Sequence, residues 1–189
     1  MNQLIYNAAV WLDNTEWSTR IHESYYLYNW IESTHVLTLM LSLGILFLID
    51  LRMLGWAFAD ISANKLATRL NVPMLLGFVV MFCTGILLVY AVPVRSAQSV
   101  WFRVKIGLLI VCAINAFIFH RKMTASIGAW DSEPRAPKAL RIGALVSLLT
   151  WSVIVICGRF IAYDWFDCSY PQSDFIRGIA GCIDGQTQF

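Results

Sequence analysis

The sequence predicts an all-α fold, a four-transmembrane-helix antiparallel bundle with short N-terminal interfacial helices. The chain is 58% hydrophobic and 14% charged, whereas a soluble domain usually carries about 25% charged residues. Four apolar stretches are each long enough to cross a bilayer, which needs roughly 20 residues. They lie at residues 28–49, 72–92, 101–119 and 140–162. We therefore predict one integral membrane domain over residues 1–189.

The N-terminal segment is apolar and aromatic over residues 4–12, too short to span a bilayer. Asp13 and Glu16 are spaced as in a capping box, which predicts that a second short helix begins there. We therefore expect two short helices lying in the outer membrane interface within residues 1–24. The four spans then occupy residues 25–163.

The boundaries of the later spans follow from proline. The second span is predicted to begin after Asn71, with Pro73 in its first turn, where a missing N–H is harmless, and to end before Pro93. The proline-containing segment 131–137 separates the third and fourth spans. Residues 164–189 form a tail outside the bundle. It carries Cys168 and Cys182, which predict a disulfide on an oxidising side of the membrane, the alternative being two free thiols.

Basic residues give an orientation. They concentrate in the loops after the first and third spans and are sparser on the opposite side. By the positive-inside rule, both termini then lie outside. A net charge of +2 without a basic run excludes nucleic acid as a partner and leaves the lipid bilayer. The loop residues are Arg52, Lys65, Arg69, Arg121, Lys122, Arg135, Lys138 and Arg141.

Glu32 and His35 are the first candidates for function. They lie three residues apart in the first span and so share a helix face. Ionisable side chains in a span cost about 2.5–3.5 kcal/mol each, and they usually face a partner, a cavity or a cofactor. At about 1.5 Å of rise per residue, Lys105 and Arg159 lie at the same depth in the third and fourth spans. These four residues are predicted to form one outer layer, with Arg103 nearby.

A haem b suits this layer. A neutral imidazole ligates iron, so His35 is the candidate metal ligand. Lys105, Arg103 and Arg159 would pair with the propionates, and Glu32 would orient His35 or relay protons. The sixth ligand stays open between Lys105, a methionine of the second span and none. In the cofactor-free alternative, His35 is a buried polar residue satisfied by hydrogen bonds.

Other metal arrangements are less well supported by the spacing. His120 is a second candidate ligand, but it lies near the inner end of its span. Asp50 and Arg52 mark the inner end of the first span, and His35 is roughly 25 Å of helix from Arg52. One cofactor bridging both histidines is therefore not expected, and His120 suits a helix end that faces lipid headgroups. His22, His35 and the methionines would suit copper. However, the sequence holds no Met-x-x-Met, Cys-x-x-Cys or His-x-His spacing.

Several strings of the chain resemble a family of uncharacterised bacterial four-span membrane proteins, and this resemblance implies the fold. A weaker resemblance rests on His35, a following Gly44, Arg52 at the end of the span, and Lys105. This pattern is similar to copper-resistance D-type proteins and to the haem-containing membrane protoporphyrinogen oxidase, and it implies His35 as haem ligand and Lys105 as its partner. The oxidase's aromatic spacing is absent and a glutamate precedes the histidine, so porphyrinogen oxidation is not expected, and whether the protein is an enzyme stays open. The strings are residues 31–37, 50–55, 102–105, 115–120 and 158–168.

The sequence thus favours a b-type-cytochrome-like haem protein of the bacterial inner membrane, with periplasmic termini. It would transfer electrons to a quinone or a periplasmic redox partner, as a homo-oligomer or as a redox subunit of a larger membrane complex. Two alternatives stay open. One is copper or small-solute transport through the same polar layer, and the other is a cofactor-free structural subunit of a membrane complex.

Overall fold

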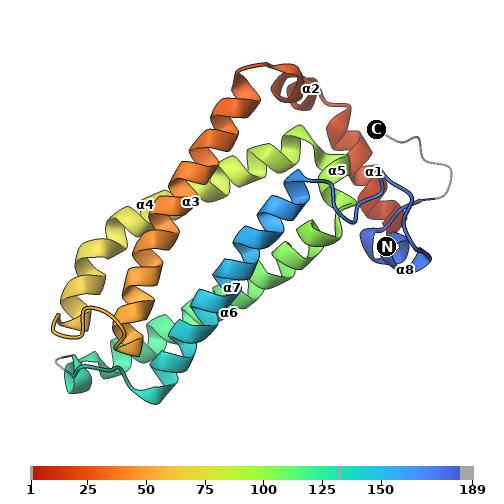
Figure 1. The fold of residues 1–189 in the computed structure, drawn as a ribbon. Helices are drawn as coiled ribbons and strands as arrows, with labels where there is room; N and C mark the ends of the chain where they lie inside the picture. Colours follow the sequence, from red (N-terminus) through yellow and green to blue (C-terminus); the bar gives the residue numbers. More distant parts are fainter. Residues whose placement is uncertain (1, 132, 184–189) are drawn as a thin grey trace. The chain divides into compact units, whose positions relative to one another are not determined.

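The computed structural model describes residues 2–131 and 133–183, and every regular element in these ranges is a helix. Of the helices in these ranges, four are long and apolar enough to cross a membrane (Figure 1). They are α3 (Leu27–Leu54), α4 (Ala63–Ala91), α6 (Val100–Trp130) and α7 (Lys138–Ala162). The predicted all-α fold with four spans is confirmed. Residues 184–189 of the predicted tail lie outside the described ranges.

The short helices match the prediction in part. Helices α1 (Asn2–Asp13) and α2 (Glu16–Glu23) are the two expected before the first span. The predicted capping box is wrong, because Asp13 is the last residue of α1. The N-cap of α2 is Thr15, whose hydroxyl accepts a hydrogen bond from the Ser18 N–H at 3.4 Å. A threonine in extended backbone is a favoured residue at this position.

Two further short helices were not expected from the sequence. Helix α5 (Pro93–Ala97) follows α4, and it begins at a proline because the first helical position needs no N–H donor. Helix α8 (Asp174–Ala180) lies in the tail and ends at Gly181, whose φ of 80° suits a residue without a Cβ.

One of the long helices begins well before its predicted apolar stretch. Helix α4 begins at Ala63 rather than after Asn71, and so Pro73 lies inside the helix rather than in its first turn. The Asp131 carboxylate explains this start. It accepts hydrogen bonds from the Asn64 N–H at 2.7 Å and from the Ser62 hydroxyl at 2.7 Å, and these contacts satisfy donors at the beginning of α4. Apolar length therefore located the membrane-crossing part of this helix but not its polar first turns.

The chain divides into two compact units. The terminal unit consists of the described parts of Met1–His35, Phe82–Gly107 and Ile154–Phe189. The central unit consists of Val36–Met81 and Leu108–Val153, less its undescribed residue. Each of the four long helices contributes one end to the terminal unit and the other end to the central unit.

The central unit contains a hydrophobic core with a cation inside it. Arg52 is 0% exposed and donates hydrogen bonds to backbone carbonyls of both loops, to Ile61 O at 2.5 Å and to Glu133 O at 2.9 Å. Arg52 thereby fastens the α3–α4 loop to the α6–α7 loop, a role that its place at the end of an apolar run did not reveal. The buried core residues around it are Ile45, Ile49, Met53, Leu54, Ala63, Trp130, Ala136, Leu140 and Ala144.

The terminal unit is fastened by Arg103. Its Nη1 donates to Ile179 O at 2.8 Å and to Asn2 Oδ1 at 3.4 Å, and its Nε donates to Ala97 O at 3.2 Å. The guanidinium therefore joins α1, α5 and the segment of α8. A disulfide joins Cys168 to Cys182, the pairing that the sequence favoured.

Candidate functional site

His35 is held by two residues of the neighbouring helix. It lies on α3 in the terminal unit, and its Nδ1 is 3.1 Å from the Oγ1 of Thr84 on α4, a residue that is only 9% exposed. The next residue of α4 is Gly85. A Cβ at that position would lie 3.1 Å from His35 Cε1, tighter than an ordinary contact. Thr84 and Gly85 therefore form a flat surface beside the imidazole ring, the seat of His35, and the Thr84 hydroxyl is a polar contact of the ring.

This seat fits a metal-ligating histidine. Histidines that bind metals commonly donate their other ring N–H to a protein acceptor, which fixes the tautomer and the ring orientation. A threonine hydroxyl can accept such a bond. When Nδ1 carries the proton and donates a hydrogen bond to Thr84, the Nε2 atom keeps a lone pair that could bind a metal ion. The contact at Nδ1 is thus compatible with a histidine that binds a metal ion through Nε2.

Lys105 lies in a second small cluster of the terminal unit. It is half-buried on α6, and a Cβ at Gly158 of α7 would lie 3.9 Å from its Nζ. The buried thiol of Cys157 interacts electrostatically with it. Gly158 thus leaves room beside the ammonium group on α7.

The other members of the predicted outer layer have different surroundings. Glu32 and Arg159 are both exposed. Arg159 contacts its own helix end, where it hydrogen-bonds the Tyr163 hydroxyl and lies 4.7 Å from the centre of that ring. The Arg103 guanidinium is engaged by the protein contacts of the terminal unit. Lys105, Arg103 and Arg159 therefore contact different groups of the protein. At His35, the partner of Nδ1 is Thr84 rather than the predicted Glu32.

The second candidate ligand, His120, is exposed on α6 in the central unit. Its backbone carbonyl accepts a hydrogen bond from the Thr124 hydroxyl at 2.9 Å, an ordinary contact within a helix. Among the described residues, no group of three or more His, Cys, Asp or Glu side chains is placed to hold a metal ion. The candidate site is therefore built on the single histidine His35.

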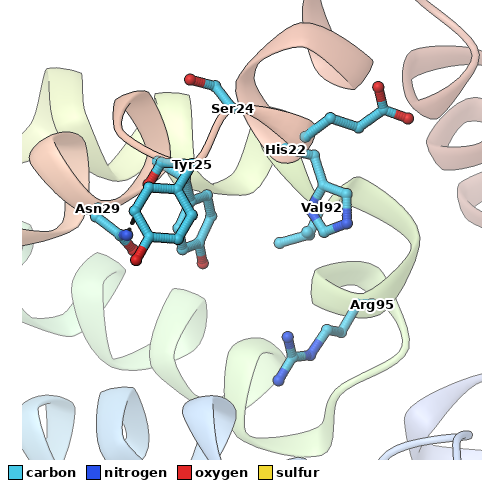
Figure 2. A pocket seen from close by; sticks show the side chains of 8 residues that line it. His22, Ser24, Tyr25, Asn29, Val92 and Arg95 are labelled. Atoms are coloured by element: carbon cyan, nitrogen blue, oxygen red, sulfur yellow. Dashed lines mark hydrogen bonds between the residues drawn. The ribbon is translucent and has the colours of Figure 1, made fainter.

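A hollow of about 370 Å³ lies in the terminal unit where α2 leads into α3. We call it the His22 hollow; Figure 2 shows His22, Tyr25 and Arg95 around it. Arg95 also forms an ion pair with Asp164, with 2.5 Å between Nε and Oδ1. The volume is within the usual range for small-molecule sites, about 300–1,000 Å³. The lining residues are His22, Glu23, Ser24, Tyr25, Tyr28, Asn29, Val92 and Arg95.

The comparison with known families covers the four long helices and the candidate site. A family model matches residues 3–164, which include all four long helices, the seat of His35 and Lys105. The chain belongs to a family of unknown function (DUF6644). The predicted resemblance to an uncharacterised family is thereby confirmed. No curated protein and no solved structure matches the chain.

Sequence reasoning did not single out Thr84 and Gly85, although one signal points to them. His35 lies eight residues after the start of α3, and Thr84 lies seven residues before the end of α4. Since the two helices run in opposite directions, this register places both residues at the same depth. A polar residue followed by glycine, level with a membrane histidine, is thus a pattern that depth matching can find.

Proposed function

We propose that this protein is a membrane-embedded haem protein that transfers electrons, with His35 as its protein ligand to iron. The observation that supports the proposal best is the contact between His35 Nδ1 and Thr84 Oγ1 at 3.1 Å beside Gly85. It supplies the orienting partner that an axial histidine needs. The weaker resemblance of the sequence pattern around His35 and Lys105 to the haem-containing oxidase family is the reason to choose haem among metal groups.

Each residue of the site has a defined role in this proposal. His35 ligates through Nε2, and Thr84 holds the proton at Nδ1 and so the orientation of the ring. Lys105 supplies a half-buried positive charge for a propionate, with Gly158 giving room on α7. Arg159 and Glu32 remain candidates at the edge of the site. A bound haem would supply a one-electron redox centre, whose potential depends on its axial ligand and on the hydrogen bonds around it.

The His22 hollow is our candidate place for a quinone head-group that exchanges electrons with this centre. The side chains of His22, Tyr28 and Arg95 offer N–H and O–H donors, which suit the carbonyl oxygens of a quinone. Tyr28 and His35 are seven residues apart on α3. They therefore share a helix face, with about 10 Å of helical rise between them. A periplasmic redox protein docking over the same region is the alternative partner.

The proposed location is the inner membrane of a bacterium, with both termini in the periplasm. The basic residues of the two loops support this orientation by the positive-inside rule. The disulfide between Cys168 and Cys182 supports it too, because disulfides persist in oxidising compartments. We further propose that the protein works as a homo-oligomer or as a subunit of a larger membrane complex.

Spectroscopy and metal analysis of the purified protein test this function. We expect a haem absorption band and one iron per bound porphyrin, both lost in His35→Ala and retained in His120→Ala, since His120 is exposed elsewhere on the chain. A protein that folds normally without any haem would contradict the proposal. Copper without haem would support the transport alternative instead.

A cofactor-free structural subunit is the second candidate function. The observation in its favour is that Arg52, Arg95 and Arg103 are all engaged by groups of the protein itself. Such contacts stabilise a scaffold without any bound group. Under this reading, His35→Ala lowers thermal stability but changes no absorption spectrum, and the protein copurifies with a partner complex.

A further inference from the structure

Asp50 is a buried carboxyl group without an ion-pair partner in the described part of the chain. It lies on α3 in the central unit, is 3% exposed, and its Oδ2 atom has no hydrogen-bond partner among the described residues. Within the same residues, the ion pairs join Arg20 to Glu16 and Arg95 to Asp164, so neither involves Asp50. The sequence indicated only that Asp50 lies near the loop-side end of the first span. In the structure its side chain is buried inside the central unit.

Two other helices supply the polar neighbours of this carboxyl. Ser147 of α7 forms a side-chain hydrogen bond with it, and the buried thiol of Cys112 on α6 is the titratable group that interacts with it. Arg52 is only two residues away, but residues two apart do not face each other on a helix. The Arg52 guanidinium is instead engaged by loop carbonyls.

An ionised carboxylate in such a place is costly. Burial of an isolated charge costs far more free energy than one hydrogen bond returns, so the charge must be removed by a proton or balanced by a cation. Hard divalent cations generally take six or more oxygen ligands. One carboxyl and one hydroxyl are too few oxygens for a stable metal site. The chemistry around Asp50 therefore suits a proton.

We propose that Asp50 is a proton-binding site within the membrane domain. Uptake of a proton forms one O–H bond on the carboxyl group and breaks no bond in the protein, and release restores the carboxylate. Asp50 lies four residues before the end of α3. This separation is about 6 Å of helical rise, so this end of α3 is the nearer one to water. This site does not depend on the proposed haem.

Polar groups continue beside this carboxyl along α7. Asn115 of α6 donates a hydrogen bond from its Nδ2 to Gly143 O at 3.0 Å. Gly143 and Ser147 are four residues apart, so this contact lies one helical turn from the hydrogen bond between Ser147 and Asp50. The proton site thus has a polar neighbour on the side toward the beginning of α7.

Infrared spectroscopy of the purified protein tests the proposal. We expect the carbonyl stretch of a protonated carboxylic acid at neutral pH, shifted in heavy water and lost in Asp50→Asn. Asp60→Asn is the matched control, because Asp60 is an exposed carboxyl of the nearby α3–α4 loop, and it should keep the band. Absence of the band from the wild-type protein would overturn the proposal, as would its persistence in Asp50→Asn.

A second variant keeps the test decisive if Asp50→Asn fails to fold. A hydrogen bond from Ser147 favours the charged form of the carboxyl, so in Ser147→Ala the acid band should persist to higher pH than in the wild type. Identical titrations of the two proteins would count against a site at Asp50. Replacing potassium by sodium at fixed pH should leave the band unchanged; a loss of the band in sodium would identify a metal-cation site instead.

Discussion

Each compact unit contains an arginine that donates hydrogen bonds to backbone carbonyls of separate segments, but the two arginines differ in their surroundings. Arg52 of the central unit is fully buried among core residues and joins two loops. Arg103 of the terminal unit is half-buried and joins the first helix to α5 and to the tail. The same chemistry thus stabilises a core in one unit and fastens chain ends in the other.

This difference separates structural cations from candidate functional groups. Arg52 and Arg103 both satisfy carbonyls that would otherwise lack donors, so their presence in or near a span is accounted for by the fold. The contacts seen for His35 and Asp50 are instead with side chains of neighbouring long helices, Thr84 of α4 and Ser147 of α7. His35 and Asp50 are therefore the residues for which the cost of an ionisable group inside a span calls for a function.

The largest effect is expected from Arg52→Ala. This change removes the charged donor from the loop carbonyls, and each such bond contributes about 1.5–3 kcal/mol. We expect the free energy of unfolding to fall by at least about 3 kcal/mol, measured by thermal unfolding in detergent. Lys65→Ala, an exposed residue near the start of α4, should change little. If Arg52→Ala were as stable as the wild type, Arg52 would not stabilise the core of the central unit, and the contrast with Arg103 would be wrong.

A smaller and more local effect is expected from Arg103→Ala. The shortest hydrogen bond of Arg103 is the one to Ile179 O of α8, at 2.8 Å, and another joins it to Asn2 of α1. Loss of the side chain should therefore loosen α1 and α8 without unfolding the four long helices. Hydrogen exchange should rise in these two helices and stay unchanged in α3 and α4. Arg20→Ala, which removes an exposed ion pair, is the control. Faster exchange throughout the protein would instead assign Arg103 the same role as Arg52.

Asp131→Ala tests the loop that Arg52 fastens. The Asn64 N–H and then the Ser62 hydroxyl lower the pKa of Asp131. A carboxyl with a lowered pKa adds stability above its unfolded-state pKa of about 3.9 and loses this contribution as the pH falls through the folded-state pKa. We expect Asp131→Ala to cost about 1 kcal/mol near neutral pH, as for loss of a helix cap. The Tm difference from the wild type should shrink in acid, and a constant difference would argue against this ionised cap.

The smallest effect is expected from Asp167→Asn in the terminal unit. Asp167 is buried, and burial raises the pKa of its carboxyl. A carboxyl with a raised pKa binds its proton more tightly in the folded state, so its contribution to stability falls as the pH rises from the unfolded-state pKa through the folded-state pKa. We expect the variant to differ from the wild type by less than about 1 kcal/mol, with its relative Tm increasing toward neutral pH. A clear loss of stability at neutral pH would contradict this.

The length of the apolar stretches was enough to predict the four spans. A helix that crosses a bilayer needs a long apolar stretch, however the helices pack against one another. Helices α5 and α8 were missed, since five and seven residues carry too little periodic pattern to be recognised. The polar first turns of α4 were missed because Asp131, far away in sequence, satisfies their donors.

The candidate site was predicted less completely than the fold. His35 stood out by the cost of its burial, but its seat on Thr84 and Gly85 depends on register between helices. Arg52 and Asp50 looked like markers of a span end, because a linear charge pattern does not show which side chains turn inward. The three-residue spacing grouped Glu32 with His35, and depth matching added Arg159, but neither argument shows which side chains are covered by other helices, and both are exposed.

The most direct test of the central claim, that His35 ligates haem iron, is chemical rescue of the missing imidazole. His35→Gly should be purified with and without free imidazole, and the reduced-minus-oxidised absorption spectrum recorded for each. We expect the haem spectrum to be lost in the variant and restored by imidazole, which enters the space left by the side chain. A His35→Gly protein with the unchanged wild-type spectrum would contradict the claim.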